Sequence, residues 1–543
     1  MSLKASNRSF AWFIGLLLLS SVPNASSVEN AKEVYMEQRQ ELMEKGEQMA
    51  FDAGTVLTQE EERLDTWLAE RTTDYIVKTR KDHTFEPARY FYEWDHERVK
   101  QTELWDFVRS MPKGGALHLH SGSSGSVDWV VEEGIWAEGG MVFWGEDETV
   151  RCLEQPFNVE VKCGEGGGGE VPLLKGMLAF FNNTDSAPEG FRLPGDLRRE
   201  EGGEGVEFKK ELRSLLVSDA SLKGMDSGEA WEFFNKIFVR VGPAMAYRKF
   251  YEGYLRNTFD VHKEDNVQHV EIRALCGNNG LGDLWDFEGK VHKGGEVIDV
   301  YRRALKEYQE SVDPDFTMKL IVSSLRVLDE ENIEEDVEEA VGLWQQNGDI
   351  IMGFDLVAEE DPNHRTLDYL DVWVKLKEWE EKEGAVLPLY FHDGESNDRN
   401  NTNVFDAVML GCKRIGHGTN LYYFPVLYNA IKEKGTVIEV NPLSNQILRY
   451  VDNLELHPVN GFLAEGFNVV IAADDPGAFG YTGLSWDWWA SLLAFQLNVK
   501  SLKTLAKGSL LHSGLEGDEL ERALEVWEGK WDEWVKGRVG MME

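Results

Sequence analysis

Histidine and acidic residues stand at the ends of several short apolar stretches of this sequence. Alternate residues of a β-strand point to the same face, so His118 and His120 in GALHLHSG can address one ligand. The stretches containing FHDGES, RIGHG and VVIAADD end in the same kind of residue. The candidate chemical residues are His118, His120, His392, Glu395, His417, Asp474 and Asp475.

Three imidazoles and one carboxylate form a typical nitrogen and oxygen donor set for zinc. The sequence therefore predicts one Zn²⁺ per chain, with the ligands His118, His120, His392 and Asp474. Each element has an ordinary alternative, because core histidines are often hydrogen-bonded without a metal. An Asp-Asp pair after a strand often caps a helix or forms a turn. The joint placement at strand ends favours the metal.

Two further side chains would move protons beside this metal. Zinc lowers the pKa of a bound water toward ~7, which gives hydroxide at neutral pH. Glu395 follows the third ligand by three residues and is predicted to carry a proton to a substrate nitrogen. His417 is predicted either to deprotonate the water or to stabilise the hydroxide. The chemistry expected is metal-assisted hydrolysis.

The elements that must position these side chains are eight apolar runs typical of buried strands. Amphipathic stretches such as TLDYLDVWVKLKEWEEKEG separate most of them. This alternation predicts an α/β fold, a (β/α)8 TIM-type barrel whose chemistry lies at the carboxyl ends of the strands. The runs are GGALHLH, NVQHVEIRAL, TMKLIVSSL, IIMGFDLVA, AVLPLYFHD, KRIGHG, TVIEVNP and NVVIAADD.

Two regions precede or interrupt this pattern. From Val28 to about Arg80, charged segments carry apolar residues three and four apart, which predicts amphipathic helices that need a packing partner, such as a second subunit. Glycine-rich segments such as GEGGGGE indicate a loop-rich insert after the first strand. The predicted divisions are a signal peptide at 1–27, an N-terminal helical region at 28–105, the first part of the barrel at 106–138, the insert at 139–223 and the rest of the barrel at 224–543.

The N-terminus has the pattern of a secretory signal. Lys4 and Arg8 precede an apolar segment, residues 10–19, which is short for a membrane span, and small residues follow at 25–27. A short membrane anchor is the alternative interpretation. No later stretch approaches the length of a membrane-spanning helix, so the sequence predicts a secreted, extracellular protein without a membrane span.

Secretion changes how the four cysteines are interpreted. Cys152 and Cys163 lie close together among glycines and polar residues, which predicts a small disulfide-closed loop. The other two cysteines follow or precede apolar runs and are predicted to be buried thiols, although a bridge between them stays open. Asn-x-Thr sequons at Asn182 and Asn400 are candidate glycosylation sites.

The charge of the chain limits its partners. Its 543 residues include 97 acidic and 56 basic side chains, a formal net charge of −41. Such a chain is repelled by phosphate backbones and by anionic lipid headgroups. The sequence therefore argues against binding to a nucleic-acid polymer and favours a small-molecule substrate.

Several motifs of this sequence resemble the adenosine deaminase superfamily and occur in its order. They are MPKGGALHLH, FHDGES, RIGHGTNL, NPLSNQIL and IAADDPGAFG. The signal segment, the long N-terminal region, the cysteine-bearing insert and GFDLVAEED are similar to the secreted adenosine deaminase-related growth factors. The resemblance implies a zinc enzyme that converts adenosine, and 2′-deoxyadenosine, to the inosine product and ammonia. The cytidine deaminase signature, HxE with PCxxC, is absent.

The resemblance also implies a role for each matching position. The four zinc ligands match those predicted above. Glu395 matches the residue that protonates the purine N1, and His417 matches the base toward the water. Asp475 matches a residue that hydrogen-bonds the purine, and Gly353 matches a glycine whose backbone faces the base.

The segment WEFFNKIF matches a stretch that covers the substrate in the family. The spacing of its aromatic residues fits an ordinary core helix equally well. The candidate substrate contacts on it are Trp231, Glu232, Phe234, Asn235 and Phe238. The resemblance further implies a homodimer built by the N-terminal helices, and an insert that serves as a candidate surface for a receptor or a glycan.

Three positions depart from the family pattern. Ser121 stands where an aspartate that contacts the ribose is usual, Leu325 where a histidine is frequent, and Asp393 where an alanine is usual. Three hypotheses follow: an adenosine deaminase, a related deaminase for a different or modified purine nucleoside, or a growth-factor-like signalling protein with weak catalysis. The complete set of zinc and acid–base residues favours an enzyme.

Overall fold

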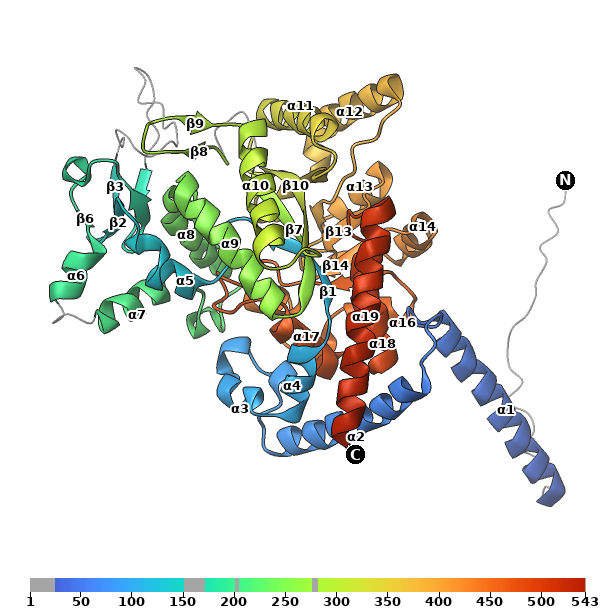
Figure 1. Ribbon diagram of the computed structural model, residues 1–543. Coiled ribbons are helices and arrows are strands. Elements are labelled where there is room, and N and C mark those ends of the chain that lie inside the picture. Colours follow the sequence, from blue (N-terminus) through green and yellow to red (C-terminus); the bar gives the residue numbers. More distant parts are fainter. Residues whose placement is uncertain (1–24, 151–170, 201–204, 276–281, 543) are drawn as a thin grey trace.

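Two four-stranded parallel sheets form the centre of the molecule (Figure 1). The computed structural model describes residues 25–150, 171–200, 205–275 and 282–542. The first sheet has the order β1 (Gly114–His120), β7 (Val267–Leu275), β10 (Thr317–Leu325) and β11 (Ile351–Val357). The second has the order β12 (His392–Asp393), β13 (Arg414–His417), β14 (Val437–Val440) and β15 (Val469–Ile471). Each predicted apolar run contains one of these strands, and the predicted α/β class is confirmed.

Short parallel bridges join the two sheets at both of their edges. Leu119 of β1 pairs with Asp474, just beyond β15, and Phe354 of β11 pairs with Leu389, just before β12. The backbone N–H of Asp474 donates to the carbonyl of His118 at 3.0 Å. Hydrogen bonding therefore continues from each sheet to the other, in the strand order of a (β/α)8 barrel.

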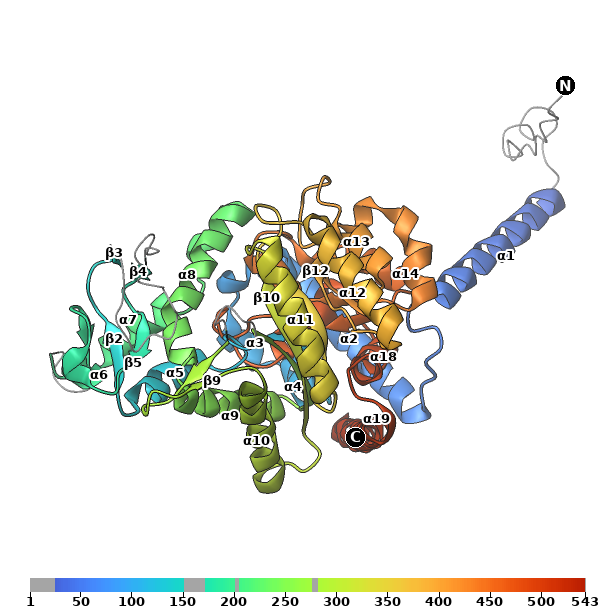
Figure 2. The same cartoon turned by 90° about the horizontal axis from the view of Figure 1, so that it is seen from above.

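Helices follow the strands along the chain and lie around them, as Figure 2 shows from a second direction. Long helices carry one apolar face, which packs on the sheets, and a charged face toward solvent. The helices after the first strand of the barrel are α5 (Val127–Glu132), α8 (Ser227–Met245), α9 (Arg248–Glu264), α10 (Gly295–Ser311), α11 (Glu330–Gln346), α12 (Leu370–Glu383), α13 (Asn403–Leu410), α14 (Tyr428–Lys434), α15 (Pro442–Ile447), α16 (Val459–Ala464), α17 (Ser485–Ala494), α18 (Val499–Leu511) and α19 (Gly517–Met542).

The N-terminal region is helical, as its periodicity predicts. It contains α1 (Ala25–Met49), α2 (Gln59–Lys81), α3 (His96–Lys100) and α4 (Glu103–Ser110). A capping box, in which Thr58 and Glu61 exchange hydrogen bonds, starts α2. Glu61 also accepts from Trp531 Nε1 at 2.7 Å and pairs with Lys503, so α2 packs on α18 and α19 of its own chain. By contrast, α1 projects from the body of the molecule (Figure 1).

The region of the predicted insert forms a small body with its own core. It contains β2 (Gly140–Phe143), β3 (Glu148–Val150), β4 (Val171–Leu173), β5 (Leu178–Phe180), β6 (Phe191–Arg192), α6 (Pro194–Glu200) and α7 (Val206–Leu215). Strands β5, β2 and β6 make an antiparallel sheet. Buried side chains such as Phe143, Met177 and Phe191 pack in a cluster apart from the main core. Cys152 and Cys163 lie outside the described residues, and the domain boundaries stay predictions.

The helices of the described residues include none that combines the length and the apolar character needed to cross a membrane. Most of the segment predicted as a signal peptide, residues 1–24, lies outside the described part of the chain. Cys412 is a buried free thiol, and Cys276 is among the residues that are not described.

Candidate metal centre

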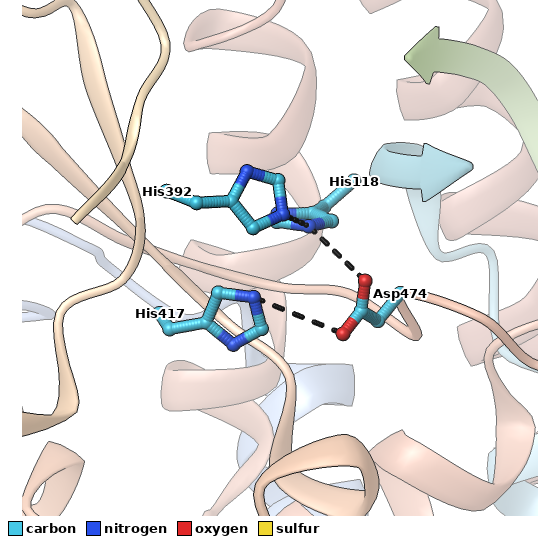
Figure 3. A group of neighbouring side chains, drawn as sticks. All are labelled: His118, His392, His417 and Asp474. Atoms are coloured by element: carbon cyan, nitrogen blue, oxygen red, sulfur yellow. Dashed lines mark hydrogen bonds and ion pairs between the residues drawn. The ribbon is translucent and has the colours of Figure 1, made fainter. Parts of the chain in front are cut away.

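The carboxyl ends of the strands bring the predicted site residues together. His120 is the last residue of β1, His392 is the first of β12, and His417 is the last of β13. Asp474 follows β15 by three residues. Donor atoms of His118, His392, His417 and Asp474 lie within 4.8 Å of one another, in four buried side chains (Figure 3).

The Nε2 atoms of two histidines converge on one carboxylate oxygen, and that of a third lies beside them. His118 Nε2 lies 3.3 Å from Asp474 Oδ1, and His120 Nε2 lies 3.0 Å from the same oxygen. His392 Nε2 lies 2.9 Å from His118 Nε2. His120 is partly exposed, so it faces the outer side of the group. The closest group of donor atoms therefore contains three of the predicted ligands together with His417, and the fourth predicted ligand, His120, joins this group through Asp474.

Two buried carboxylates fix which nitrogen of each ring carries the proton. His118 Nδ1 lies 2.6 Å from Glu439 Oε2, and His392 Nδ1 lies 2.8 Å from Asp355 Oδ2. Carboxylate oxygens accept hydrogen bonds, so both rings hold a proton on Nδ1. Their Nε2 lone pairs then face each other, and a cation is needed to offset the repulsion. Burial lowers the pKa of His392 well below its usual range, which favours a metal ion over a proton.

One buried oxygen also fits a metal here. Asp474 Oδ1 makes no hydrogen bond among the described residues, although the Nε2 atoms of His118 and His120 lie near it. Leaving a buried carboxylate oxygen without a hydrogen bond costs free energy. Asp474 and His417 also have positive φ angles, 65° and 64°, a strained conformation that is frequent at functional sites. The donor set therefore fits a divalent ion such as zinc.

A network of buried ion pairs supports the ligands from inside the sheets. Glu439 accepts from Arg273 at 2.6 Å and from Arg414 at 2.5 Å, besides His118. Arg414 also pairs with Glu271, and Arg273 with Asp355. Burial alone would raise the pKa of Glu439, but the two arginines hold it well below its usual range. Glu439 is therefore a carboxylate that keeps the His118 ring in one orientation.

The Glu395 carboxyl is buried at the edge of this cluster. Glu360 holds the loop that carries it, because its carboxylate accepts from the backbone N–H of Gly394 at 3.0 Å and of Glu395 at 2.5 Å. Glu395 Oε1 lies 3.3 Å from His417 Nδ1. Burial, then the nearby carboxylates of Asp474 and Glu360, raise the pKa of Glu395 well above its usual range. This side chain can keep a proton at neutral pH.

Asp475 lies beside Asp474 and is held by Ser123. The hydroxyl of Ser123, three residues after His120, donates to Asp475 Oδ1. Burial and the charge of Asp474 raise the pKa of Asp475 well above its usual range. Asp475 is thus a second buried carboxyl within reach of the cluster.

Helix α8 borders the loops that carry the cluster. Trp231 Nε1 donates to Tyr450 Oη at 2.8 Å, and Phe234 stacks on Phe479, four residues after Asp475. A Cβ atom placed on Gly122 would lie 3.6 Å from the ring of Phe238. The other two predicted contacts, Glu232 and Asn235, have exposed side chains. The aromatic residues of α8 are therefore both core residues and neighbours of the site.

The structure does not bring Gly353 to the cluster. Gly353 lies two residues before Asp355 in β11, and a Cβ there would collide with the Pro388 carbonyl, 2.2 Å away, and with the Tyr390 ring. Its lack of a side chain is thus explained by close packing between β11 and the segment before β12. Ala358, just after β11, has a φ of 85°, in the region that favours glycine.

The strained backbone of Ala358 leads to a stability prediction. Replacing Ala358 with glycine should raise the free energy of unfolding by about 0.5–1 kcal/mol, because an L-residue at positive φ is strained by more than glycine loses in chain entropy. The midpoint of denaturant unfolding measures the change. Ala340→Gly, inside α11, is the control and should be destabilising by about 1 kcal/mol. A lower midpoint for Ala358→Gly would contradict the strain at this position.

One of the three departures from the family pattern makes a buried ion pair. Asp393 accepts from Thr366 Oγ1 at 2.6 Å and lies 3.3 Å from Arg326 Nη2, which also donates to the His392 carbonyl. Burial raises the pKa of Asp393 well above its usual range, with Arg326 opposing the rise. Ser121 and Leu325 are half-buried at the ends of β1 and β10.

Most of the side chains that support the site were not predicted from the sequence. The supporting residues are Arg273, Glu360, Arg414, Glu439, Ser444 and Asn445. Arg273, Arg414 and Glu439 are charged residues inside predicted buried strands. A charge within a buried strand requires a partner, and this was the available signal.

Comparison with known proteins adds independent findings. The family model described as "Adenosine deaminase" matches residues 231–526. The adenosine deaminase of Aedes albopictus is 26% identical over 515 residues, covering 92% of this chain and 88% of that protein. Adenosine deaminase 2 of Homo sapiens is 27% identical over 517 residues, covering 92% and 93%. The structure of the N6-methyl-AMP deaminase from Arabidopsis thaliana has a TM-score of 0.51 at 14% identity, covering 79% of this chain and 99% of that one, a likeness of fold alone.

Proposed function

Because this chain belongs to the adenosine deaminase family, we propose that it is a secreted zinc enzyme that replaces the exocyclic amino group of adenosine, and of 2′-deoxyadenosine, with oxygen. The observation that carries the proposal is the gathering of His118, His120, His392 and the Asp474 carboxylate, with the buried Glu395 carboxyl at the edge of the group. The products are the inosine nucleoside and ammonia.

The proposed cofactor is one Zn²⁺ per chain. His118, His120, His392 and Asp474 would hold it, and this set of nitrogen and oxygen donors suits zinc. When bound, zinc acts as a Lewis acid that makes water nucleophilic at neutral pH. Glu439 and Asp355 would keep two ligand rings in the tautomer that offers Nε2 to the metal.

Glu395 is the proposed proton donor to the purine N1. Burial and the nearby carboxylates raise the pKa of Glu395, which favours the protonated carboxyl that a donor requires. Protonation of N1 draws electrons from C6, so the oxygen of a water adds to C6 and the amino group leaves as ammonia. Of the two water protons, one leaves with the amine and one restores Glu395, so the reaction balances.

Binding of the purine is proposed to involve Asp475 and helix α8. Asp475, held by Ser123, would hydrogen-bond the base. Trp231, Phe234 and Phe238 would cover the substrate from α8, because these rings pack beside the loops that carry the cluster. His417, next to Asp474, would contact the water.

We also propose that the chain forms a homodimer through its N-terminal helices. Helix α1 projects from the body, and apolar side chains on it, including Tyr35, Met36 and Leu42, are exposed. Covering such side chains in a partner subunit would remove them from water. The insert is proposed as a surface for a receptor or a glycan, on the family resemblance.

Secretion would follow from the N-terminal signal, residues 1–27. It would permit the disulfide between Cys152 and Cys163. It would also permit glycosylation at Asn182 and Asn400, and both of these asparagines are exposed.

Purified protein should bind one zinc per chain and release ammonia from adenosine, with the ultraviolet change that accompanies formation of inosine. Removal of the metal with a chelator should abolish turnover, and added Zn²⁺ should restore it. The measurements are elemental analysis and ammonia release from adenosine, 2′-deoxyadenosine, N6-methyladenosine and adenine. A protein that binds zinc and deaminates another aminopurine but not adenosine would have a different substrate. Ser121 and Leu325, which depart from the family pattern, make this the leading alternative. A chain that binds no metal would contradict the proposal.

A further inference from the structure

His457 is a buried imidazole outside the metal cluster, and no step of the proposed reaction uses it. It lies between the 3-10 helix Leu454–Leu456 and α16. Its Nδ1 accepts from the backbone N–H of Val459 at 3.1 Å. A backbone nitrogen can only donate, so His457 Nδ1 holds a lone pair and the ring is neutral with its proton on Nε2. Burial lowers the pKa of His457 to about 3, which keeps the ring neutral in the working range of pH.

The proton of His457 fixes the orientation of a neighbouring amide. His457 Nε2 lies 3.0 Å from Asn445 Oδ1, on α15. Because Nε2–H donates, the atom of Asn445 that faces it must be the oxygen. The two ends of an asparagine amide are often assigned by choice, but here a backbone N–H determines them. The Asn445 Nδ2 group therefore points the other way.

That amide nitrogen faces His417. Asn445 Nδ2 lies 3.0 Å from His417 Nδ1, and the Asn441 amide lies 3.4 Å from the same nitrogen. An amide N–H donates, so His417 Nδ1 must accept and carries no proton. The proton of His417 is then on Nε2, which is buried and lies 3.8 Å from Asp474 Oδ2. Glu395 Oε1 lies 3.3 Å from the same Nδ1 atom. It can also hydrogen-bond to this unprotonated nitrogen only when the Glu395 carboxyl is protonated and donates.

We propose that Asn445 and His457 are positioning residues that fix His417 in the Nε2–H tautomer, so that His417 offers a hydrogen-bond donor, and not a base, toward Asp474 and the reacting water. His417 was predicted either to deprotonate the water or to stabilise the hydroxide, and this tautomer favours stabilisation of the hydroxide. The consequence for catalysis rests on the proposed function, whereas the tautomer itself does not.

The tautomer can be read directly in the zinc-loaded protein labelled with ¹⁵N-histidine. Long-range ¹H–¹⁵N correlation spectra distinguish protonated from unprotonated ring nitrogens, and a His417→Asn variant assigns the His417 signals by their loss. We expect the parent His417 to have an unprotonated Nδ1. A protonated Nδ1 in the parent would overturn the proposal, whether or not the protein turns over adenosine. Absence of adenosine turnover with the expected spectrum would contradict only the proposed function.

Asn445→Asp tests the relay, because a carboxylate cannot donate to His417 Nδ1. The His417 proton should move to Nδ1, and kcat should fall on the order of 10²-fold with KM close to the parent value. Asn498→Asp, at the N-cap of α18, is the matched control and should change neither kcat nor the spectrum, since aspartate caps equally well. An Asn445→Asp protein with parental kcat and an unchanged His417 spectrum would overturn the relay.

A second variant keeps the test decisive if Asn445→Asp does not fold. His457→Phe removes the donor that orients Asn445 and keeps an aromatic ring beside Phe495. The Asn445 amide can then turn over, so His417 should show a mixture of tautomers and a lower kcat per bound zinc. A purely structural role of His457 would lower the unfolding temperature and leave the His417 spectrum as in the parent, and this result would count against the proposal.

Discussion

Glu395→Gln is expected to lower kcat by about 10³-fold while the protein keeps its zinc. Glutamine has nearly the shape of the protonated glutamate and can occupy the same buried place beside Glu360. It cannot give up a proton to the purine N1 and recover one from water. Measurement of kcat together with zinc per chain separates loss of chemistry from loss of metal.

The neighbouring acidic residue Glu359 supplies a matched control. Its side chain is half-buried, and burial together with Asp361 raises its pKa to about 7. Glu359→Gln makes the same chemical change just after β11. It should leave kcat close to that of the parent, because Glu359 is only the smallest of the contributions that raise the pKa of Glu395. If Glu395→Gln retained most of the activity at full zinc content, another group would have to donate the proton.

Glu439→Gln is expected to be destabilising by about 3–5 kcal/mol and to weaken zinc binding by about 10–100-fold. Glu439 accepts from His118, Arg273 and Arg414, and all of these groups are buried. Glutamine would remove one of the two carboxylates that each arginine pairs with and would turn an amide N–H toward one of the donors. Thermal unfolding and competition with a zinc chelator measure the two effects.

Glu271→Gln separates these two effects. Glu271 pairs with Arg414 in the same network but makes no contact with His118. Its replacement should lower stability in a similar way and leave zinc affinity near the parental value. Equal losses of zinc affinity in the two variants would mean that the network acts through the whole fold and not through the His118 ring.

The sequence predicted the strands and the residues at their ends because both signals are local. An apolar run such as NVVIAADD predicts a buried strand, and its terminal carboxylates stand where a parallel fold gathers its chemistry. The partners of His118 and His392 were not predictable in this way. Glu439 and Asp355 come from other strands, and the spacing within a strand gives the face of a side chain but not its neighbour.

The relay from His457 through Asn445 to His417 was also beyond the sequence. These residues belong to three separate segments, and their arrangement in space depends on two loops that have no periodic pattern. The positive φ of Ala358 was likewise not predictable, because a sequence does not display backbone angles.

Helical periodicity predicted α1 and α2 but not what they pack against. The apolar face of α2 is covered by α18 and α19 of the same chain, through contacts such as Glu61 with Trp531. The pattern of α1 is similar, yet α1 leaves the body of the molecule. Amphipathicity states that a helix requires a partner, and only tertiary structure identifies the partner.

The pairing of β1 with the segment after β15 also has a consequence for biosynthesis. His118 and His120 are made early, and Asp474 follows them by about 350 residues. At about 5–20 residues per second, the ribosome needs on the order of tens of seconds to cover that distance. The first two proposed ligands must wait for the last one, since the Leu119–Asp474 bridge joins the first and last strands. The proposed zinc would therefore be captured by the full set only after translation is nearly complete, so metal loading would report the final step of folding.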